Sequence, residues 1–322
     1  MTVNIVVVTH EAIVFGCDSV ASSVKRFVDP TTLNLKPNGN GGFSTDIKFS
    51  DVQEVVVDVT PGVMKMFELH NKNDTHVAAI TTGVAELDGR SMGDLSHEFF
   101  EKQKAMAKPR ANVKVVASDF YKFIRGKYLE IYPEGPNQFK PWLEFLIGGY
   151  GKKDRFPRLY RVYVHEDKIL KVHSDGSGGT AWGGQSTAVE GFLNGVANQM
   201  KNSIEFQYAE SIKSLQQGFV NSLVDYETKT GTKIAINDLK LPNAAQLDWR
   251  STNGINTSGF SDQTAVNLTS HLVNTQSGLA RFEYGVATVG GRTRIGIITR
   301  KHGFKSLNEP ELTHAHTGLL DE

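Results

Sequence analysis

The sequence predicts an α+β fold in which two stacked antiparallel sheets carry helices on their outer faces, an αββα sandwich. The first observation behind this prediction is the order of the elements: two strand pairs, two helices, further strands, two helices, one more helix and a last strand. The second is composition, because 322 residues with 39% hydrophobic and 22% charged side chains are typical of a globular chain with a sizeable core.

Charge and cysteine content exclude several classes of protein. Lys+Arg and Asp+Glu both number 35, so the chain carries no electrostatic footprint for nucleic acid or an anionic membrane. The single cysteine, Cys17, excludes a disulfide framework and is typical of a reducing cytosol. No apolar run reaches the roughly 18 residues of a membrane span, and the N-terminus lacks the order of a signal peptide. We expect a soluble, cytoplasmic protein.

The chain begins with two apolar runs, Val3–Val8 and Ala12–Cys17, which read as strands of a hairpin joined by Thr9-His10-Glu11. Thr2 stands directly after the initiator methionine, which is normally removed before so small a residue. The mature chain would then start at Thr2 with a free α-amino group. Its hydroxyl is a nucleophile, and the adjacent amine can serve as the base.

Such a pair needs a nearby cation, because a free α-amine has a pKa near ~8 and a hydroxyl is a far weaker acid. A lysine ammonium would lower the pKa of the amine and stabilise the developing alkoxide. Asp18 ends the second run, and the hairpin returns it to the side of Thr2. We therefore expect Asp18 to hold such a lysine.

Thr2, Asp18 and the small-residue run Ser19-Val20-Ala21-Ser22 resemble the proteasome β-subunits of the Ntn hydrolases and their bacterial relatives of the HslV and Anbu types. The spacing from Thr2 to Asp18 matches that pattern without a gap. The alternative is an ordinary strand that begins near a terminus, since short motifs give false positives.

Residues 24–58 are rich in glycine, asparagine and proline, and we expect them to form an insertion. Strands are predicted at Gly62–Leu69 and His76–Thr82, joined by turn residues at 71–74. The first resembles the family's lysine-bearing strand, so the resemblance implies that Lys65 is the catalytic lysine and Asp18 its partner. The alternative is an exposed lysine on an edge strand.

The segment 82–86 is predicted to lie at a strand-to-helix junction. The resemblance implies that the Gly83 N–H binds the oxyanion, where the lack of Cβ and the positive end of a helix would help. An ordinary helix-entry glycine is the alternative. The resemblance also implies that Ser22, Thr81 and Ala85 line the substrate pocket, and their small, uncharged side chains favour apolar substrate residues.

Helical spacing predicts two helices next, the first along Leu95 and Phe99 up to Pro109, the second from Val113 to before Pro133. Strands are predicted at 145–151 and within 158–174, with a hairpin turn at Glu166-Asp167. This block also resembles the family, through Gly148, Gly149, Pro157, Leu159 and Tyr160.

In the last third, residues 181–186 are predicted to open a helix, and Tyr208–Leu223 to form an amphipathic helix of the same layer. Residues 228–258 are taken as a second insertion. A final helix is expected from about Asp262, with Ser261 as N-cap and an apolar stripe that includes Leu279 and Phe282. A loop and strand at 285–299 would close the domain over residues 1–305. The tail 306–322 is polar, and its His314-x-His316 pair is expected in solvent without metal.

Three positions depart from the family pattern. Gly183 stands where the supporting serine falls, while Val286 and Val289 occupy the places of an aspartate and a serine that support the threonine amine. Thr288 or a residue from elsewhere could substitute. Whether these departures abolish activity stays open.

The resemblance implies a threonine-type endopeptidase that needs no cofactor. Thr2 would attack the peptide carbonyl with its own amine as base, aided by Lys65, Asp18 and Gly83. The chain has no G-x-x-x-x-G-K-[ST] loop, so any ATP-dependent unfoldase would be a separate protein. Unfolded proteins or peptides are the expected substrates, and stacked homo-oligomeric rings or an open spiral the expected assembly. The alternatives are a catalytically inactive shell protein and an Ntn amidohydrolase of small amides.

Overall fold

The computed structural model describes residues 2–28, 36–37, 43–44, 52–108, 110–135, 140–233, 255–282 and 288–307. The chain divides into two compact units, one of Met1–Ser186 with Asn256–Glu322 and one of Thr187–Ile255. The predicted mixture of helices and antiparallel sheets is confirmed. The single domain with insertions near 24–58 and 228–258 stays a prediction, and most of the second insertion lies outside the described residues.

The first unit contains two five-stranded antiparallel sheets. Sheet A has the strand order β14 (Gly179–Gly184), β1 (Val3–Val8), β2 (Ala12–Cys17), β15 (Arg294–Thr299) and β16 (Gly303–Ser306). Sheet B has the order β13 (Lys168–Lys171), β12 (Arg158–Tyr163), β11 (Leu143–Tyr150), β8 (Thr75–Gly83) and β7 (Met66–Lys72). The turn between β7 and β8 has positive φ at Asn73 and Asp74, as the predicted turn residues require.

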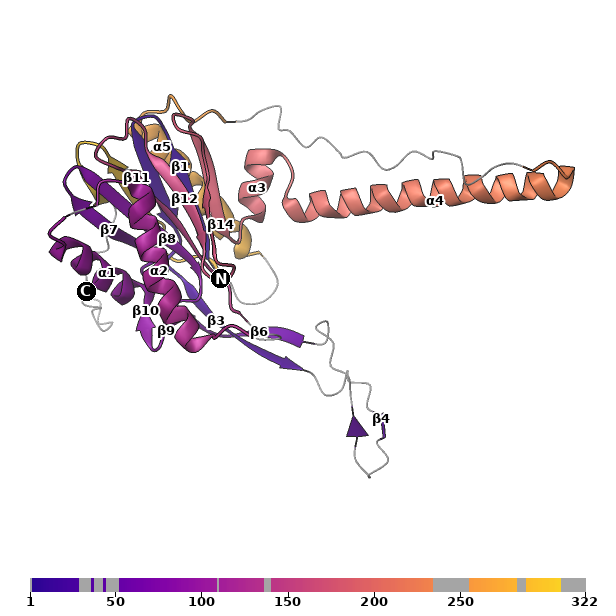
Figure 1. Ribbon diagram of the computed structural model, residues 1–322, viewed down its shortest axis with the longest axis horizontal. Helices are drawn as coiled ribbons and strands as arrows, with labels where there is room; N and C mark the ends of the chain where they lie inside the picture. The colour runs from indigo at the N-terminus through magenta and orange to yellow at the C-terminus, as the bar shows by residue number, and fades with distance from the viewer. Residues whose placement is uncertain are drawn as a thin grey trace, which may run out of the picture. The chain divides into compact units, whose positions relative to one another are not determined.

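Short two-stranded ribbons complete the described strands of this unit. They are β3 (Ala21–Val28) with β6 (Val52–Thr60), β4 (Lys36–Pro37) with β5 (Phe43–Ser44), and β9 (Glu86–Leu87) with β10 (Arg90–Ser91). Figure 1 shows the start of the chain at the end of the sheets from which β3 and β6 project.

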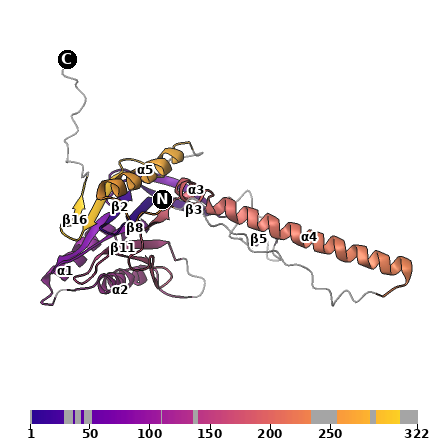
Figure 2. The ribbon, with the colours of Figure 1, turned by 90° about the horizontal axis from the view of Figure 1, so that it is seen from above.

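Helices cover the sheets on opposite sides. Helices α1 (Met92–Ala105) and α2 (Val113–Ile131) contact sheet B, and α5 (Asp262–Ala280) contacts β1, β2 and β15 of sheet A. Figure 2 shows α5 on one side of the strands and α1 and α2 on the other. Sheets A and B also contact each other, through β1, β14, β15 and β16 against β8 among others.

Strand β1 is buried along its whole length because it has a partner on each face. Side chains alternate along a strand, so Val6 and Val8 face sheet B, where they share a core cluster with Ile80 and Leu146. A second cluster lies between sheet B and its helices, and Phe120 and Phe145 meet there edge to face at 5.0 Å. Burial of β1 on both faces explains why, apart from Asn4, the sequence at 3–8 consists of Val and Ile.

Helix α5 starts as predicted, with the Ser261 hydroxyl accepting the Thr264 N–H at 3.2 Å. Its predicted apolar stripe is wrong at the far end, since Leu279 is 38% and Phe282 89% exposed. The buried side chains of α5 combine two larger apolar residues, Leu272 and Val273, with small or polar ones: Ala265, Thr269, Gln276, Ser277 and Ala280. Small side chains allow the helix to approach the strands closely, and Thr269 Cγ2 fills the space above Gly16.

The prediction that residues 181–186 open a helix is wrong. They belong largely to β14, which pairs with β1 in the register Val3 to Gly184 and Ile5 to Trp182. Tertiary pairing overrides the local signal here, because β1 would otherwise present an unpaired edge. Helix α3 (Thr187–Asn194) starts only after this strand.

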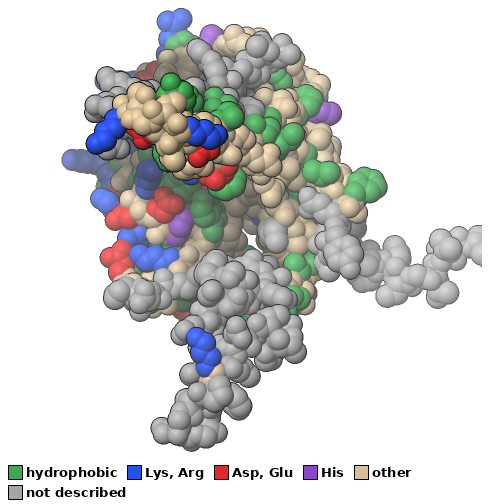
Figure 3. Space-filling view, turned by 90° about the vertical axis from the view of Figure 1, so that its right-hand side faces the viewer, with side chains coloured by type: hydrophobic (Ala, Val, Ile, Leu, Met, Phe, Trp, Pro, Cys, Tyr) green, Lys and Arg blue, Asp and Glu red, His purple; other side chains and the backbone are tan. Residues whose placement is uncertain are grey.

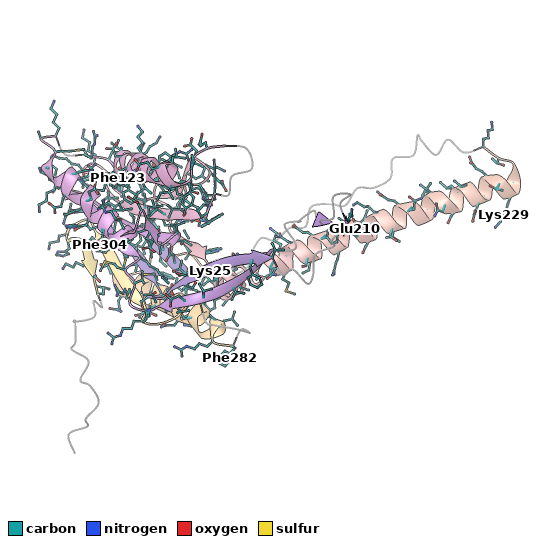
Figure 4. The ribbon with its side chains drawn as sticks, turned by 90° about the horizontal axis from the view of Figure 1, so that it is seen from below. Lys25, Phe123, Glu210, Lys229, Phe282 and Phe304 are labelled. Atoms are coloured by element: carbon teal, nitrogen blue, oxygen red, sulfur yellow. The ribbon has the colours of Figure 1, made fainter. Side chains whose placement is uncertain are left out.

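The second unit contains α3 and α4 (Asn198–Thr230), a helix of 33 residues that ends at Gly231 with φ +68°. Helicity at Tyr208–Leu223 is confirmed, and within this helix Leu215 is 70% and Phe219 49% exposed. Figure 4 shows side chains along α4, among them Glu210 and Lys229.

Acidic and basic side chains are interspersed on the face shown in Figure 3, in keeping with the equal numbers of the two charges. None of the described helices combines the length and the apolar character needed to cross a lipid bilayer.

Cys17 provides a direct test of the fold. It is fully buried, and burial raises the pKa of its thiol to about 12. Since only the thiolate is reactive, we expect no reaction with a disulfide reagent at pH 8 in the native protein, and full reaction of the single thiol in guanidinium. Rapid labelling under native conditions would contradict the position of β2 in the sheet interior.

Candidate active site

Thr2 lies just before β1 and is buried, with 4% of its surface exposed. Strand alternation puts its side chain on the same face as Asn4 and Val6, toward sheet B. Its carbonyl accepts the Gln185 N–H at 2.7 Å, which ties it to the end of β14. Gly184 has φ +79°, and a Cβ there would lie 2.0 Å from that carbonyl oxygen, so the site requires glycine at this position.

Asp18 follows β2 and lies beside Thr2, as the predicted hairpin requires. Thr2 Oγ1 donates to Asp18 Oδ1 at 2.6 Å, and the Val3 N–H donates to the same oxygen at 3.0 Å. The N–H groups of Val20 and Gly290 both donate to Oδ2 at 3.2 Å. Because both oxygens accept backbone N–H groups, the carboxylate is held in one orientation and its burial is compensated.

Lys65 completes the cluster. Its side chain is buried, and Nζ forms an ion pair with Asp18 Oδ1 at 2.7 Å while also donating to Thr2 Oγ1 and to the Val20 carbonyl. Burial lowers the pKa of Lys65, and the charge of Asp18 acts in the opposite direction. The structure thus brings together three residues that are 63 positions apart at most.

Lys65 was predicted inside a strand at Gly62–Leu69, and this detail is wrong. Strand β7 begins at Met66, so Lys65 is the last residue of the preceding connection. Its carbonyl accepts the Thr81 N–H at 2.9 Å, which fixes it beside β8. Because it stands outside the strand, its side chain is free of the alternation that sends Phe67 toward the helices.

A pocket of about 760 Å³ opens onto this cluster. Its lining includes Thr2 and Lys65, and it also includes the other residues predicted at the site: Ser22, Thr81, Gly83 and Ala85. Asp18 lies beneath the surface of the pocket, in contact with Thr2 and Lys65. The volume is in the range of small-molecule and peptide side-chain sites.

Gly83 ends β8 with φ +104°, and a Cβ there would lie 2.0 Å from the Trp142 carbonyl oxygen. Successive N–H groups of a strand point to opposite sides, and those of Thr81 and Val84 donate to Lys65 and Trp142 respectively. The Gly83 N–H is therefore expected on the Lys65 side. The predicted strand-to-helix junction is wrong, because the β9–β10 ribbon separates Gly83 from α1.

Of the three positions that depart from the family pattern, Gly183 and Val289 belong to the described residues, and Val286 lies outside them. Gly183 is part of β14, and Val289 is buried next to Gly290. The Thr288 hydroxyl, which the sequence offered as a substitute, is 3.4 Å from Gln185 Oε1, and Gln185 lines the pocket. Polar groups from two segments thus lie beside Thr2 without the expected serine.

Sequence reasoning missed a polar cluster between the sheets. Asn4 Nδ2 donates at 2.6 Å to the Thr81 carbonyl and at 2.6 Å to Thr82 Oγ1, which links β1 to β8. Glu144 on β11 pairs with Thr82 across the strands and lies 3.3 Å from Arg161 Nη1. Burial raises the pKa of Glu144. The sequence did contain an indication of this cluster, because Asn4 and Glu144 are each the one strongly polar residue in an otherwise apolar strand.

Among the described residues, no group of three or more His, Cys, Asp or Glu side chains could hold a metal ion.

Comparison with known proteins gives little further information. No protein-family model matches the chain, and no curated protein matches its sequence. A solved structure similar to it is the helical assembly of the Anbu complex from Pseudomonas aeruginosa, with 10% sequence identity and a TM-score of 0.45. The match covers 96% of this chain and 88% of that chain. At this identity and TM-score the similarity carries no argument about the chemistry of the site.

The link between β1 and β8 yields a stability prediction. Asn4→Ala leaves the Thr81 carbonyl and the Thr82 hydroxyl without their buried donor, so the free energy of unfolding should fall by about 1–3 kcal/mol. Urea titration measures the change. The control is Asn267→Ala on the exposed face of α5, where we expect almost no effect. Equal effects of the two variants would show that the cross-sheet hydrogen bonds contribute nothing to stability.

Proposed function

We propose that the chain is an N-terminal threonine hydrolase of the proteasome-like Ntn type that cleaves peptide bonds. The observation that carries the proposal is the buried contact of Lys65 with both Thr2 Oγ1 and Asp18 in the wall of a pocket. A buried ion pair is expensive to desolvate and is weak evidence for a purely stabilising role. Ionisable groups arranged this way in a cleft are candidates for chemistry.

In the proposed reaction, removal of Met1 frees the Thr2 amine. That amine takes the proton from Thr2 Oγ1 as the oxygen attacks the substrate carbonyl, and it later returns a proton to the leaving amine. The Lys65 ammonium lies beside Oγ1 and stabilises its developing negative charge, while Asp18 holds Lys65 in place. The Gly83 N–H stabilises the oxyanion, and water hydrolyses the ester.

The arrangement of the layers supports the αββα sandwich that this proposal requires. Helices α1 and α2 contact sheet B, sheet B contacts sheet A, and α5 contacts sheet A. The opening of the pocket toward Thr2 is compatible with an extended peptide, and Ser22, Thr81 and Ala85 lie in its wall. Delivery of unfolded chains by a separate ATP-dependent unfoldase in the cytoplasm is part of the same proposal.

The inactive-shell alternative has one specific observation in its favour, which is glycine at 183 and valine at 289 in place of supporting polar residues. The proximity of Thr288 to Gln185 beside Thr2 weighs against it. The two functions make opposite predictions for covalent labelling of Thr2.

We expect Thr2→Ala and Lys65→Ala each to lower the rate of peptide hydrolysis by several orders of magnitude. Removing one member of a cooperative catalytic unit abolishes most of the rate enhancement that the whole unit provides. Thr2→Ser, which keeps a hydroxyl, is the matched control and should retain activity. A fluorogenic peptide panel with apolar residues before the scissile bond measures the rates. Activity retained in Lys65→Ala would contradict the role of Lys65.

Intact-mass measurement tests the nucleophile directly. We expect the active protein to lack Met1, since an acylated Thr2 amine cannot act as a base. An epoxyketone or β-lactone should add one equivalent to the native protein and none to Thr2→Ala. Retention of methionine in a peptide-cleaving sample would refute the mechanism, and failure of labelling in a processed sample would favour the shell protein.

Assembly is the last consequence of the proposal. A reactive N-terminus is hazardous in a free monomer, and closed or helical homo-oligomers confine such sites. We expect stacked rings or an open spiral, detected by light scattering as a mass many times that of the 35.4 kDa chain. A stable monomer would contradict this and favour a hydrolase of small amides.

A further inference from the structure

The pocket has an aromatic wall on the side of Gly83 that the proposed chemistry does not use. Trp142 lines the pocket with 47% of its surface exposed, and the pocket lining also includes Tyr132 and Pro141. Nearly half of Trp142 is therefore open to contact by a ligand in the pocket. All three residues belong to the connection between α2 and β11 or to its ends.

The indole of Trp142 is fixed in place although it is exposed. His165 stacks against it with ring centroids 4.4 Å apart and a tilt of 41°, and Tyr163 meets it edge-on at 5.8 Å. The His165 Nδ1 lies 3.2 Å from the Leu143 carbonyl, which holds the imidazole in turn. The Trp142 carbonyl accepts the Val84 N–H at 2.9 Å. Because the indole is already held in one orientation, binding a ligand against it costs the protein little side-chain entropy.

The indole also lies next to the proposed oxyanion donor. A Cβ built on Gly83 would be 3.0 Å from Trp142 Cδ1, so the ring edge borders the Gly83 backbone. A substrate carbonyl held near the Gly83 N–H would bring a neighbouring side chain to the ring. Among the described residues of the pocket lining, Lys65 and Glu86 carry charge, and Lys65 is already paired with Asp18. Glu86 would repel an acidic side chain.

We propose that Trp142, with Tyr132, forms a subsite for an aromatic side chain of the peptide substrate adjacent to the reacting carbonyl. This inference rests on the proposed function for the identity of the substrate, although binding itself does not require hydrolysis. Aromatic pairs prefer offset or edge-to-face contacts and gain affinity beyond the area that they bury. A phenylalanine or tyrosine side chain can make such a contact with the open part of the indole.

The test measures binding in the full-length Thr2→Ala protein, where no turnover occurs. Dye-labelled, N-acetylated pentapeptides carry one Phe at each position in turn, with Gly or Glu as replacements, and fluorescence anisotropy gives Kd. At one position we expect Phe to bind about tenfold more tightly than Gly, and Glu to bind most weakly. Trp142→Ala should reduce the Phe-to-Gly ratio to near one, while Trp142→Phe should retain most of it.

The control is Phe282→Ala, since Phe282 is 89% exposed, projects from the end of α5 (Figure 4) and is not part of the pocket lining. It should leave the ratio unchanged. Tyr132→Ala tests the same wall independently, and there the ratio should fall severalfold even if Trp142→Ala does not fold. An unchanged ratio in the wall variants, or no preference for Phe in the parent, would overturn the subsite.

The outcomes also separate the subsite from the proposed hydrolysis. Preference for Phe in the Thr2→Ala protein, together with no turnover by the unsubstituted protein, would refute the hydrolysis and leave the subsite intact. Turnover with the same Phe-to-Gly preference in Trp142→Ala and Tyr132→Ala would refute the subsite and leave the hydrolysis intact.

Discussion

The buried ion pair between Lys65 and Asp18 is the constraint on which the rest of the site depends. Both side chains are withdrawn from water, and such a pair persists only if hydrogen bonds compensate for the lost hydration. Backbone N–H groups from β1, from the segment after β2 and from the loop before β15 supply them by donating to Asp18. Three parts of the chain are therefore held around one carboxylate, and Thr2 is positioned as a consequence.

The nucleophile and the oxyanion donor lie on different sheets, so their separation depends on how the sheets pack. Asn4, two residues after Thr2, donates to the carbonyl of Thr81 and the hydroxyl of Thr82, immediately before Gly83. These two short contacts hold β1 against β8 at the level of the site. An apolar residue at position 4 would pack the sheets as well but would not set their relative position along the strands.

Two glycines permit close approaches that no other residue would allow. Gly184 brings β14 against the Thr2 carbonyl, and Gly83 brings β8 against the carbonyl of Trp142. Each has positive φ, and each hypothetical Cβ would collide with a backbone oxygen. The second approach also sets the Trp142 indole beside the pocket, so the same backbone geometry serves the reacting carbonyl and the proposed aromatic subsite.

Strong local signals in the sequence predicted the first hairpin, the turn at 71–74, the N-cap at Ser261 and two helices before Pro109 and Pro133, which the structure places at Met92–Ala105 and Val113–Ile131. The sequence also indicated Thr2, Asp18 and Lys65 as neighbours, through strand geometry and resemblance. Only the tertiary structure decided that 181–184 form a strand, because pairing with β1 outweighs local preference. It alone revealed Asn4, Glu144 and Trp142, whose partners are distant in sequence and whose surroundings therefore have no local pattern.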